Sequence, residues 1–183
     1  MESAWKMQDT LAILRSKWIT VFAEHWRDSS GALLEYWRVE RCDSVIVLPF
    51  HRNRFLCPEE MFRPGIGRCT LDFPGGRLPV NLEPRSTALG ILERELGIAP
   101  HYVRSLKSIN EYGFIVDSAF SSQKVWGFIA DLDPLTMNIS PKPFRSFPCT
   151  EEGLKELLNL LECLQCRALL LESINKKLFE LAY

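Results

Sequence analysis

Residues 72–98, DFPGGRLPVNLEPRSTALGILERELGI, decide the fold that this sequence predicts. They continue a strand end at residues 70–73 and contain a sharp turn at Pro74-Gly75-Gly76. A helix is expected after the turn because apolar residues recur there at intervals of three and four. These apolar residues are Ala88, Leu89, Leu92 and Leu96. Gly97 is expected to end the helix, since glycine readily adopts the left-handed backbone found at helix ends.

This arrangement has two interpretations. A strand, a glycine turn and a helix that carries carboxylates are the parts of a site for phosphate and metal. The alternative is a structural loop followed by a core helix. The order strand, glycine turn and helix fits both interpretations.

The stretch resembles the Nudix box, the loop-helix motif of enzymes that hydrolyse nucleoside diphosphates linked to another group. That motif reads G-x5-E-x7-R-E-U-x-E-E-x-G-U, where U is a bulky aliphatic residue, and Gly76 stands at its first position. The other matching residues are Leu92, Glu95, Gly97 and Ile98. The lead-in at residues 72–76 and EMFRP at residues 60–64 resemble the ADP-ribose pyrophosphatase branch of that family.

The resemblance implies an α/β (α+β) Nudix fold, in which a mixed β-sheet is sandwiched between helices and preceded by an N-terminal β-hairpin. We expect one domain over residues 1–183, with a Nudix core at 43–183. The residue pattern predicts a helical appendage at 1–15 and a hairpin at 16–42, whose turn is DSSG at 28–31. In the resembled branch a similar hairpin serves dimerisation, which implies a homodimer.

The box departs from the motif at four positions that hold glutamates or arginine in the family. The residues present there are Leu82, Gly90, Ile91 and Arg94, and Glu83 stands next to the first of them. Hard cations such as Mg²⁺ need several oxygen ligands, and only Glu95 remains on the metal-binding face of the helix. Arg94 adds a positive charge that opposes a cation. We therefore expect weak or lost Mg²⁺-dependent hydrolysis of an ADP-ribose-class substrate.

The resemblance also supplies candidate site residues. Glu95 is the expected catalytic residue, and Glu95 and Asp72 are the expected metal ligands. The expected substrate-binding residues are Arg63, Arg68, Gly76 and Arg94. An arginine side chain can donate two hydrogen bonds to one phosphate group. A glycine loop with exposed arginines that bind no ligand explains Arg63 and Arg68 equally well. Glu111 and Asp117 are the acidic residues available to activate water. The alternative is that both are surface residues exposed to solvent, with no catalytic role.

The expected cofactor depends on whether the protein still catalyses hydrolysis. Mg²⁺ is expected if the chain is active, and no cofactor is needed otherwise. The partner is then a nucleoside diphosphate derivative. The alternative functions are a non-catalytic nucleotide-sugar sensor, a protein-interaction scaffold, and a purely structural protein.

Two cysteines, Cys163 and Cys166, form a CxxC within residues 157–171, which are expected to be one continuous helix. The amphipathic extension through Leu181 is expected either to continue this helix or to bind a partner. Without a second cysteine pair or a nearby histidine, we expect no zinc site. A redox role is not expected either, because the motif is predicted to lie in the middle of a helix rather than at its start. All six cysteines are interpreted as reduced thiols.

The charge composition argues against nucleic-acid and membrane partners. The chain has 22 basic and 23 acidic residues, so its overall field attracts neither nucleic acid nor an anionic membrane. No apolar run is long enough for a transmembrane helix. The N-terminal residues lack the apolar core of a secretory signal, so we expect a cytoplasmic protein.

Overall fold

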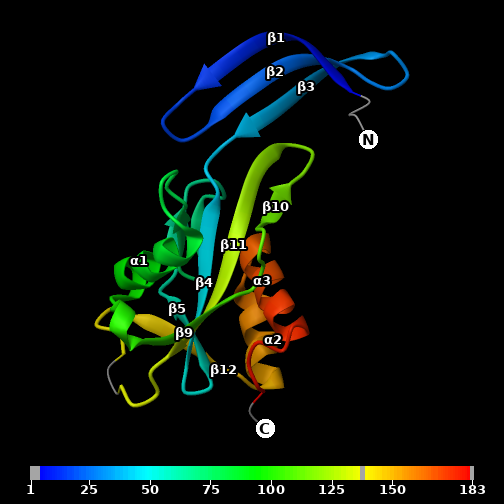
Figure 1. The fold of residues 1–183 in the computed structure, drawn as a ribbon. Helices are drawn as coiled ribbons and strands as arrows, with labels where there is room; N and C mark the ends of the chain where they lie inside the picture. Colours follow the sequence, from blue (N-terminus) through cyan, green and yellow to red (C-terminus); the bar gives the residue numbers. More distant parts are fainter. Residues whose placement is uncertain (1–4, 137–138, 182–183) are drawn as a thin grey trace. The chain divides into compact units, whose positions relative to one another are not determined.

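The computed structural model describes residues 5–136 and 139–181 (Figure 1). The chain forms two compact units. The first comprises Met1–Asp43 and Ile115–Lys124, and the second comprises Ser44–Phe114 and Val125–Tyr183. The assignment of a single domain over residues 1–183 stays a prediction. Within the described ranges, no helix combines the length and the apolar character needed to cross a membrane.

The first unit is an antiparallel sheet. Its strands are β1 (Lys6–Arg15), β2 (Thr20–Arg27) and β3 (Leu33–Glu40), joined in the order β1-β2-β3. The turn between β2 and β3 forms because the Asp28 carboxylate accepts the backbone N–H groups of Ser30 and Ala32, while Gly31 takes a φ of 88°. The predicted hairpin and its turn are therefore confirmed.

The predicted helix at residues 1–15 is wrong, because Lys6–Arg15 is strand β1. This strand pairs with β2 from Lys6↔Arg27 to Arg15↔Thr20, with two register shifts along its length. Pairing with β2 gives the backbone N–H and C=O groups of β1 hydrogen-bond partners on another strand. A short isolated helix would have to form all of these bonds within itself and is only marginally stable. Residues 1–4 lie outside the described part of the chain.

The second unit is built on a mixed sheet. Its central strands are parallel: β4 (Ser44–His51) pairs with residues 125–131 of β11 (Ser121–Leu132). On its other side β11 pairs antiparallel with β9 (Val103–Ser108). The remaining strands of this unit are β5 (Arg54–Pro58), β12 (Phe144–Pro148), β8 (Gly75–Arg77), β6 (Met61–Arg63) and β7 (Arg68–Thr70). The short β10 (Phe114–Asp117), most of which belongs to the first unit, also pairs with β11.

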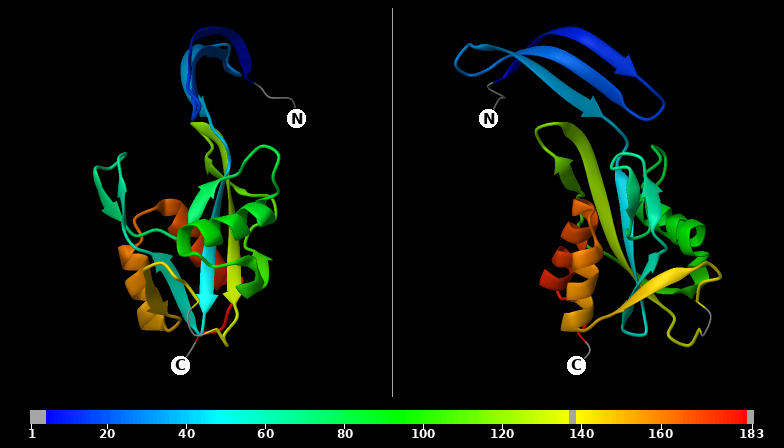
Figure 2. Two further views of the ribbon diagram at one scale, coloured as in Figure 1. Left: turned by 90° about the vertical axis from the view of Figure 1, so that its left-hand side faces the viewer. Right: turned by 180° about the vertical axis from the view of Figure 1, so that it is seen from behind.

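Helices cover both faces of this mixed sheet. Helix α1 (Pro84–Leu96) packs through Ile91 and Leu92 into a core that includes Val45 and Phe128. The neighbouring strand residue, Gly127, faces away from that core, since successive strand residues point to opposite faces. Helix α3 (Leu164–Asn175) covers this second face, where Leu169 lies against Gly127. The predicted sandwich of a mixed sheet between helices is confirmed (Figures 1 and 2).

The C-terminal region differs from the prediction of one continuous helix. Helix α2 (Glu151–Leu160) ends before Leu161, and α3 begins at Leu164. Leu161 leaves the helix because its backbone forms a parallel β-bridge with Leu71. Helix α3 then ends at Asn175, so the helix does not continue through Leu181, and partner binding by this extension stays a prediction. No glycine or proline marks the break between the helices, which explains why the local pattern did not reveal it.

Candidate functional site

The glycine turn that begins the box lies against the start of β4. Gly75 and Gly76 of β8 pair with Ile46 and Val45 of that strand. A Cβ atom on Gly76 would lie 2.8 Å from Nη2 of Arg94, so only glycine permits this close approach of the guanidinium.

Helix α1 ends as predicted from the sequence. Gly97 adopts a φ of 70°, its N–H bonds to the carbonyl of Glu93, and the N–H of Ile98 bonds to that of Leu92. The bond from Gly97 to Glu93 is that of an αL cap, and both bonds satisfy carbonyl groups that the helix leaves unpaired. The end of the helix fixes the register of the residues that precede it, including Glu95.

Arg94 binds both the glycine turn and the remaining box glutamate. Its Nη2 donates to the carbonyl oxygen of Gly75 at 2.9 Å, and its Nε donates to Oε1 of Glu95 at 2.9 Å. The Arg94 side chain is 57% exposed and the Glu95 side chain 20%. The carboxylate of Glu95, which a hard cation would need as a ligand here, is thus already held by a positive charge.

The other altered positions of the box contribute no metal ligand. Ile91 is 1% exposed and lies in the core, whereas Leu82 and Gly90 are exposed residues without oxygen-bearing side chains. Glu83, the expected substitute, is the N-cap residue of α1 and makes no capping hydrogen bond. Across residues 5–136 and 139–181, no cluster of three close metal-ligating groups includes Glu95. The box residues present here do not fit a Mg²⁺ site.

Asp72 and the two predicted phosphate-binding arginines are engaged in ion pairs. Arg63 donates to Oδ2 of Asp72 from Nη2 at 2.6 Å and from Nε at 2.9 Å. Arg68, which pairs with Arg63 across the β6–β7 ladder, binds Glu162. Both arginines remain accessible, so a ligand phosphate would compete with a carboxylate for each of them.

The two acids considered for water activation lie in different units and in exposed positions. Glu111 belongs to the second unit, and Asp117 belongs to the first. Oδ1 of Asp117 accepts the N–H of Ala119 at 3.1 Å, which explains the residue as part of a turn. Neither acid belongs to the cluster of metal-ligating groups found in the described residues.

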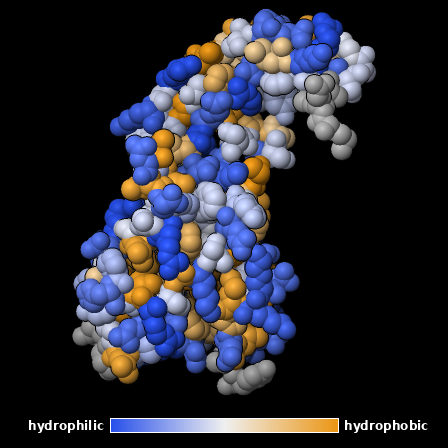
Figure 3. All heavy atoms as spheres, viewed as in Figure 1, coloured by the Kyte–Doolittle hydropathy of each residue, from blue (hydrophilic) through white to orange (hydrophobic). Residues whose placement is uncertain are grey.

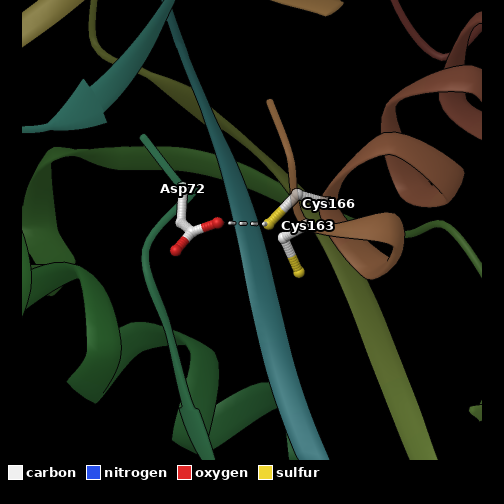
Figure 4. Close-up of side chains that lie close together, drawn as sticks. All are labelled: Asp72, Cys163 and Cys166. Atoms are coloured by element: carbon white, nitrogen blue, oxygen red, sulfur yellow. Dashed lines mark hydrogen bonds between the residues drawn. The ribbon is translucent and has the colours of Figure 1, made fainter. Parts of the chain in front are cut away.

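The prediction that the CxxC lies in mid-helix is wrong. Cys163 is the N-cap residue of α3, and Cys166 lies in its first turn. A hydrogen bond from Cys166, together with backbone N–H groups of the helix start, lowers the pKa of Cys163 to about 6. The same contact and burial raise the pKa of Cys166. Both thiols lie beside Asp72 (Figure 4), whose Oδ1 is 3.9 Å from Sγ of Cys166.

Sequence reasoning missed the meeting of Asp72 with this cysteine pair. The three residues come from segments about 90 positions apart, and only the folded chain brings them together. The one available signal was the CxxC itself, because its spacing suits a helix start as well as a helix interior.

Comparison with known proteins supports the fold and leaves the activity open. No protein-family model matches the chain, and no curated protein matches it. A solved structure described as "Crystal structure of ADP compounds hydrolase" superposes with a TM-score of 0.76. The alignment covers 96% of this chain and 95% of that chain at 16% sequence identity. This similarity confirms the predicted Nudix-type fold.

Proposed function

We propose that this protein is a nucleotide-binding member of the Nudix fold in which Mg²⁺-dependent hydrolysis is weak or lost. The ligand is a nucleoside diphosphate derivative of the ADP-ribose class. The supporting observation is the guanidinium of Arg94, which binds both the Gly75 carbonyl and the Glu95 carboxylate. The solved structure with this fold is described as an ADP compounds hydrolase, which supports the ligand class.

The energetic argument against a metal centre has two parts. A unit positive charge 4 Å from Arg94 near the protein surface is opposed by about 4 kcal/mol, and a dication by more. Each lost group that stabilises a transition state typically lowers the rate about a hundredfold, equivalent to ~2.7 kcal/mol. Glu95 alone does not offset both effects, so catalysis as an ordinary hydrolase is not expected.

The same charges favour an anionic ligand. Arg94 presents a guanidinium beside two glycines, where the backbone allows a phosphate to approach closely. Phosphate accepts paired hydrogen bonds from arginine. A diphosphate would displace the Glu95 carboxylate from Arg94 and bind without metal, with Arg63 and Arg68 as further donors on the β6–β7 hairpin.

A homodimer formed through the first unit belongs to the same proposal. Every residue of β1 is exposed, and apolar side chains of this sheet reach the surface (Figure 3). They include Met7, Leu11, Ile13, Leu14, Trp18 and Trp37. An exposed apolar area of this kind on a small sheet is typical of a protein interface. We also propose a cytoplasmic location, supported by six cysteines, none of which forms a disulfide in the described part of the chain.

The decisive experiment measures binding and turnover separately. Calorimetry with ADP-ribose in excess chelator is expected to show binding to the wild type, weakened about tenfold by Arg94→Ala, which corresponds to ~1.4 kcal/mol. Lys155→Ala, an exposed change on α2, is the matched control and is expected to bind normally. A product-release assay with Mg²⁺ is expected to show little turnover. Rapid turnover that Glu95→Gln abolishes would overturn the proposal.

A further inference from the structure

Three groups that commonly bind metals converge away from the Arg94 contact. The Sγ atoms of Cys163 and Cys166 and a carboxylate oxygen of Asp72 all lie within 4.8 Å of one another. This is the one such cluster among the residues that the structure describes. Figure 4 shows the two thiols of α3 and the Asp72 carboxylate close together.

The backbone around the cluster explains how such distant segments meet. The β-bridge between Leu71 and Leu161 joins the strand end before Asp72 to the link between α2 and α3. The ion pair between Arg68 and Glu162 adds a second connection between these segments. Asp72 and Cys163 each lie within two residues of the bridge, so their positions are fixed by the fold.

The Asp72 carboxylate is oriented by its own neighbours. Arg63 and Thr70 both donate to Oδ2, the latter at 3.1 Å. The other oxygen, Oδ1, accepts a hydrogen bond from the Cys166 thiol, with Sγ at 3.9 Å. Metal-ligating groups are usually held in this way, by hydrogen bonds to the atom that does not bind the metal.

We propose that Cys163, Cys166 and Asp72 bind one zinc ion, with water as the fourth ligand. Zinc prefers tetrahedral sites with thiolate, imidazole and carboxylate ligands, whereas Mg²⁺ prefers oxygen alone. Bond lengths of ~2.3 Å to sulfur and ~2.1 Å to oxygen place tetrahedral ligand atoms ~3.5–3.8 Å apart. The observed cluster needs only a small contraction to reach that geometry.

The carboxylate distinguishes a cation site from a simple disulfide pair. A disulfide between Cys163 and Cys166 would need no third group. Asp72 accepts a hydrogen bond from the Cys166 thiol, and once that thiol loses its proton the carboxylate would repel the thiolate. A bound dication removes this repulsion and uses all three groups. The ion would tie the strand end that enters the glycine turn to the start of α3, independently of whether the chain binds nucleotides.

Zinc itself is the probe for the test. The full-length protein, stripped with chelator and kept reduced, is titrated with Zn²⁺ against a chromophoric chelator. One equivalent is expected to bind, and Cys163→Ser or Cys166→Ser is expected to lower the affinity about a hundredfold or more. Asp72→Asn, which keeps the size of the side chain, is expected to lower it at least tenfold. Cys42→Ser, an exposed cysteine in the first unit, is the matched control and should bind as the wild type does.

Two further readouts identify the ligands. Co²⁺ in place of Zn²⁺ is expected to give the absorption of a tetrahedral ion with thiolate-to-cobalt charge transfer. Zn²⁺ is also expected to protect Cys163 and Cys166, but not Cys42 or Cys69, from alkylation. Equal zinc affinity in the wild type and in folded Cys163→Ser or Cys166→Ser variants would overturn the proposal. A cobalt spectrum without charge transfer, or a disulfide that forms equally well in the presence of zinc, would also overturn it.

Discussion

The Arg94 guanidinium donates a hydrogen bond to the carbonyl oxygen of Gly75 at 2.9 Å, across the glycine turn. This contact places a fixed cation between the turn and the helix that follows it. The helix position that brings Arg94 to the turn also brings Glu95 to Arg94. A single side chain therefore places a positive charge against both the turn and the remaining glutamate of the box.

Replacing this cation and the buried aliphatic residue with carboxylates is expected to create Mg²⁺ affinity. Ile91→Glu with Arg94→Glu would supply two carboxylates on the helix that already carries Glu95. Because Ile91 is 1% exposed, the buried charge should lower stability by about 3 kcal/mol without metal. Mg²⁺ is then expected to raise the thermal midpoint of the double variant but not that of the wild type.

Arg94→Glu alone is the control for this experiment, because it reverses the charge without adding a buried ligand. It should gain much less from Mg²⁺ than the double variant. If calorimetry shows no Mg²⁺ binding to a folded double variant, the register of the box on α1 is not the one that we infer.

The buried pair Glu24–Arg38 in the first unit makes stability depend on pH. The Glu24 side chain is 4% exposed, and Arg38 binds both of its oxygens, at 2.9 and 3.0 Å. These hydrogen bonds lower the pKa of Glu24 from 4.5. Its contribution is therefore complete above the unfolded-state pKa and is lost as the pH falls through the folded-state pKa.

Glu24→Gln is accordingly expected to lower the free energy of unfolding by about 2 kcal/mol at pH 7. The difference from the wild type should shrink below pH 4, as urea titrations at several pH values would show. Glu40→Gln is the matched control, since Glu40 binds the same Arg38 but is 51% exposed. Its effect should stay below about 1 kcal/mol. Equal effects of the two changes would contradict the assignment.

The exposed apolar sheet of the first unit predicts a change of assembly on mutation. Leu14 of β1 is 65% exposed, and Leu14→Lys is expected to turn a dimer into a monomer in sedimentation experiments. Val80→Lys alters an even more exposed residue of the second unit and should leave the assembly unchanged. A wild-type protein that sediments as a monomer at micromolar concentration would rule out a stable homodimer.

Much of the fold could be predicted from local sequence. The 3.6-residue period of α1, the glycine at its end and the turn at residues 28–31 each act through contacts only a few residues away. Strand β1 and the break before α3 could not be predicted in this way. Strand β1 depends on backbone pairing with the next strand, β2, and the break before α3 depends on a backbone bridge to the distant residue Leu71.

The candidate site was likewise only partly predictable from the local sequence. The sequence indicated that Arg94 occupies a metal-ligand position, because the motif register fixes its place on the helix. It did not indicate that Arg94 would bind the Gly75 carbonyl, or that Asp72 would meet Cys163 and Cys166. Those contacts depend on how the turn and the C-terminal helices pack on the sheet.

The packing of α3 on the sheet is expected to be sensitive to one methyl group. A Cβ atom on Gly127 of β11 would lie 2.3 Å from a methyl carbon of Leu169, which is fully buried. Gly127→Ala should therefore destabilise the protein by ~1–3 kcal/mol, because the buried Leu169 side chain would have to shift within the core. Gly90→Ala is the matched control: no atom lies within 4 Å of the added group, and its helical position should make alanine stabilising by ~0.5–1 kcal/mol. Thermal and urea unfolding of both variants measures the two effects. A Gly127→Ala protein as stable as the wild type would show that α3 does not rest on β11 at this point.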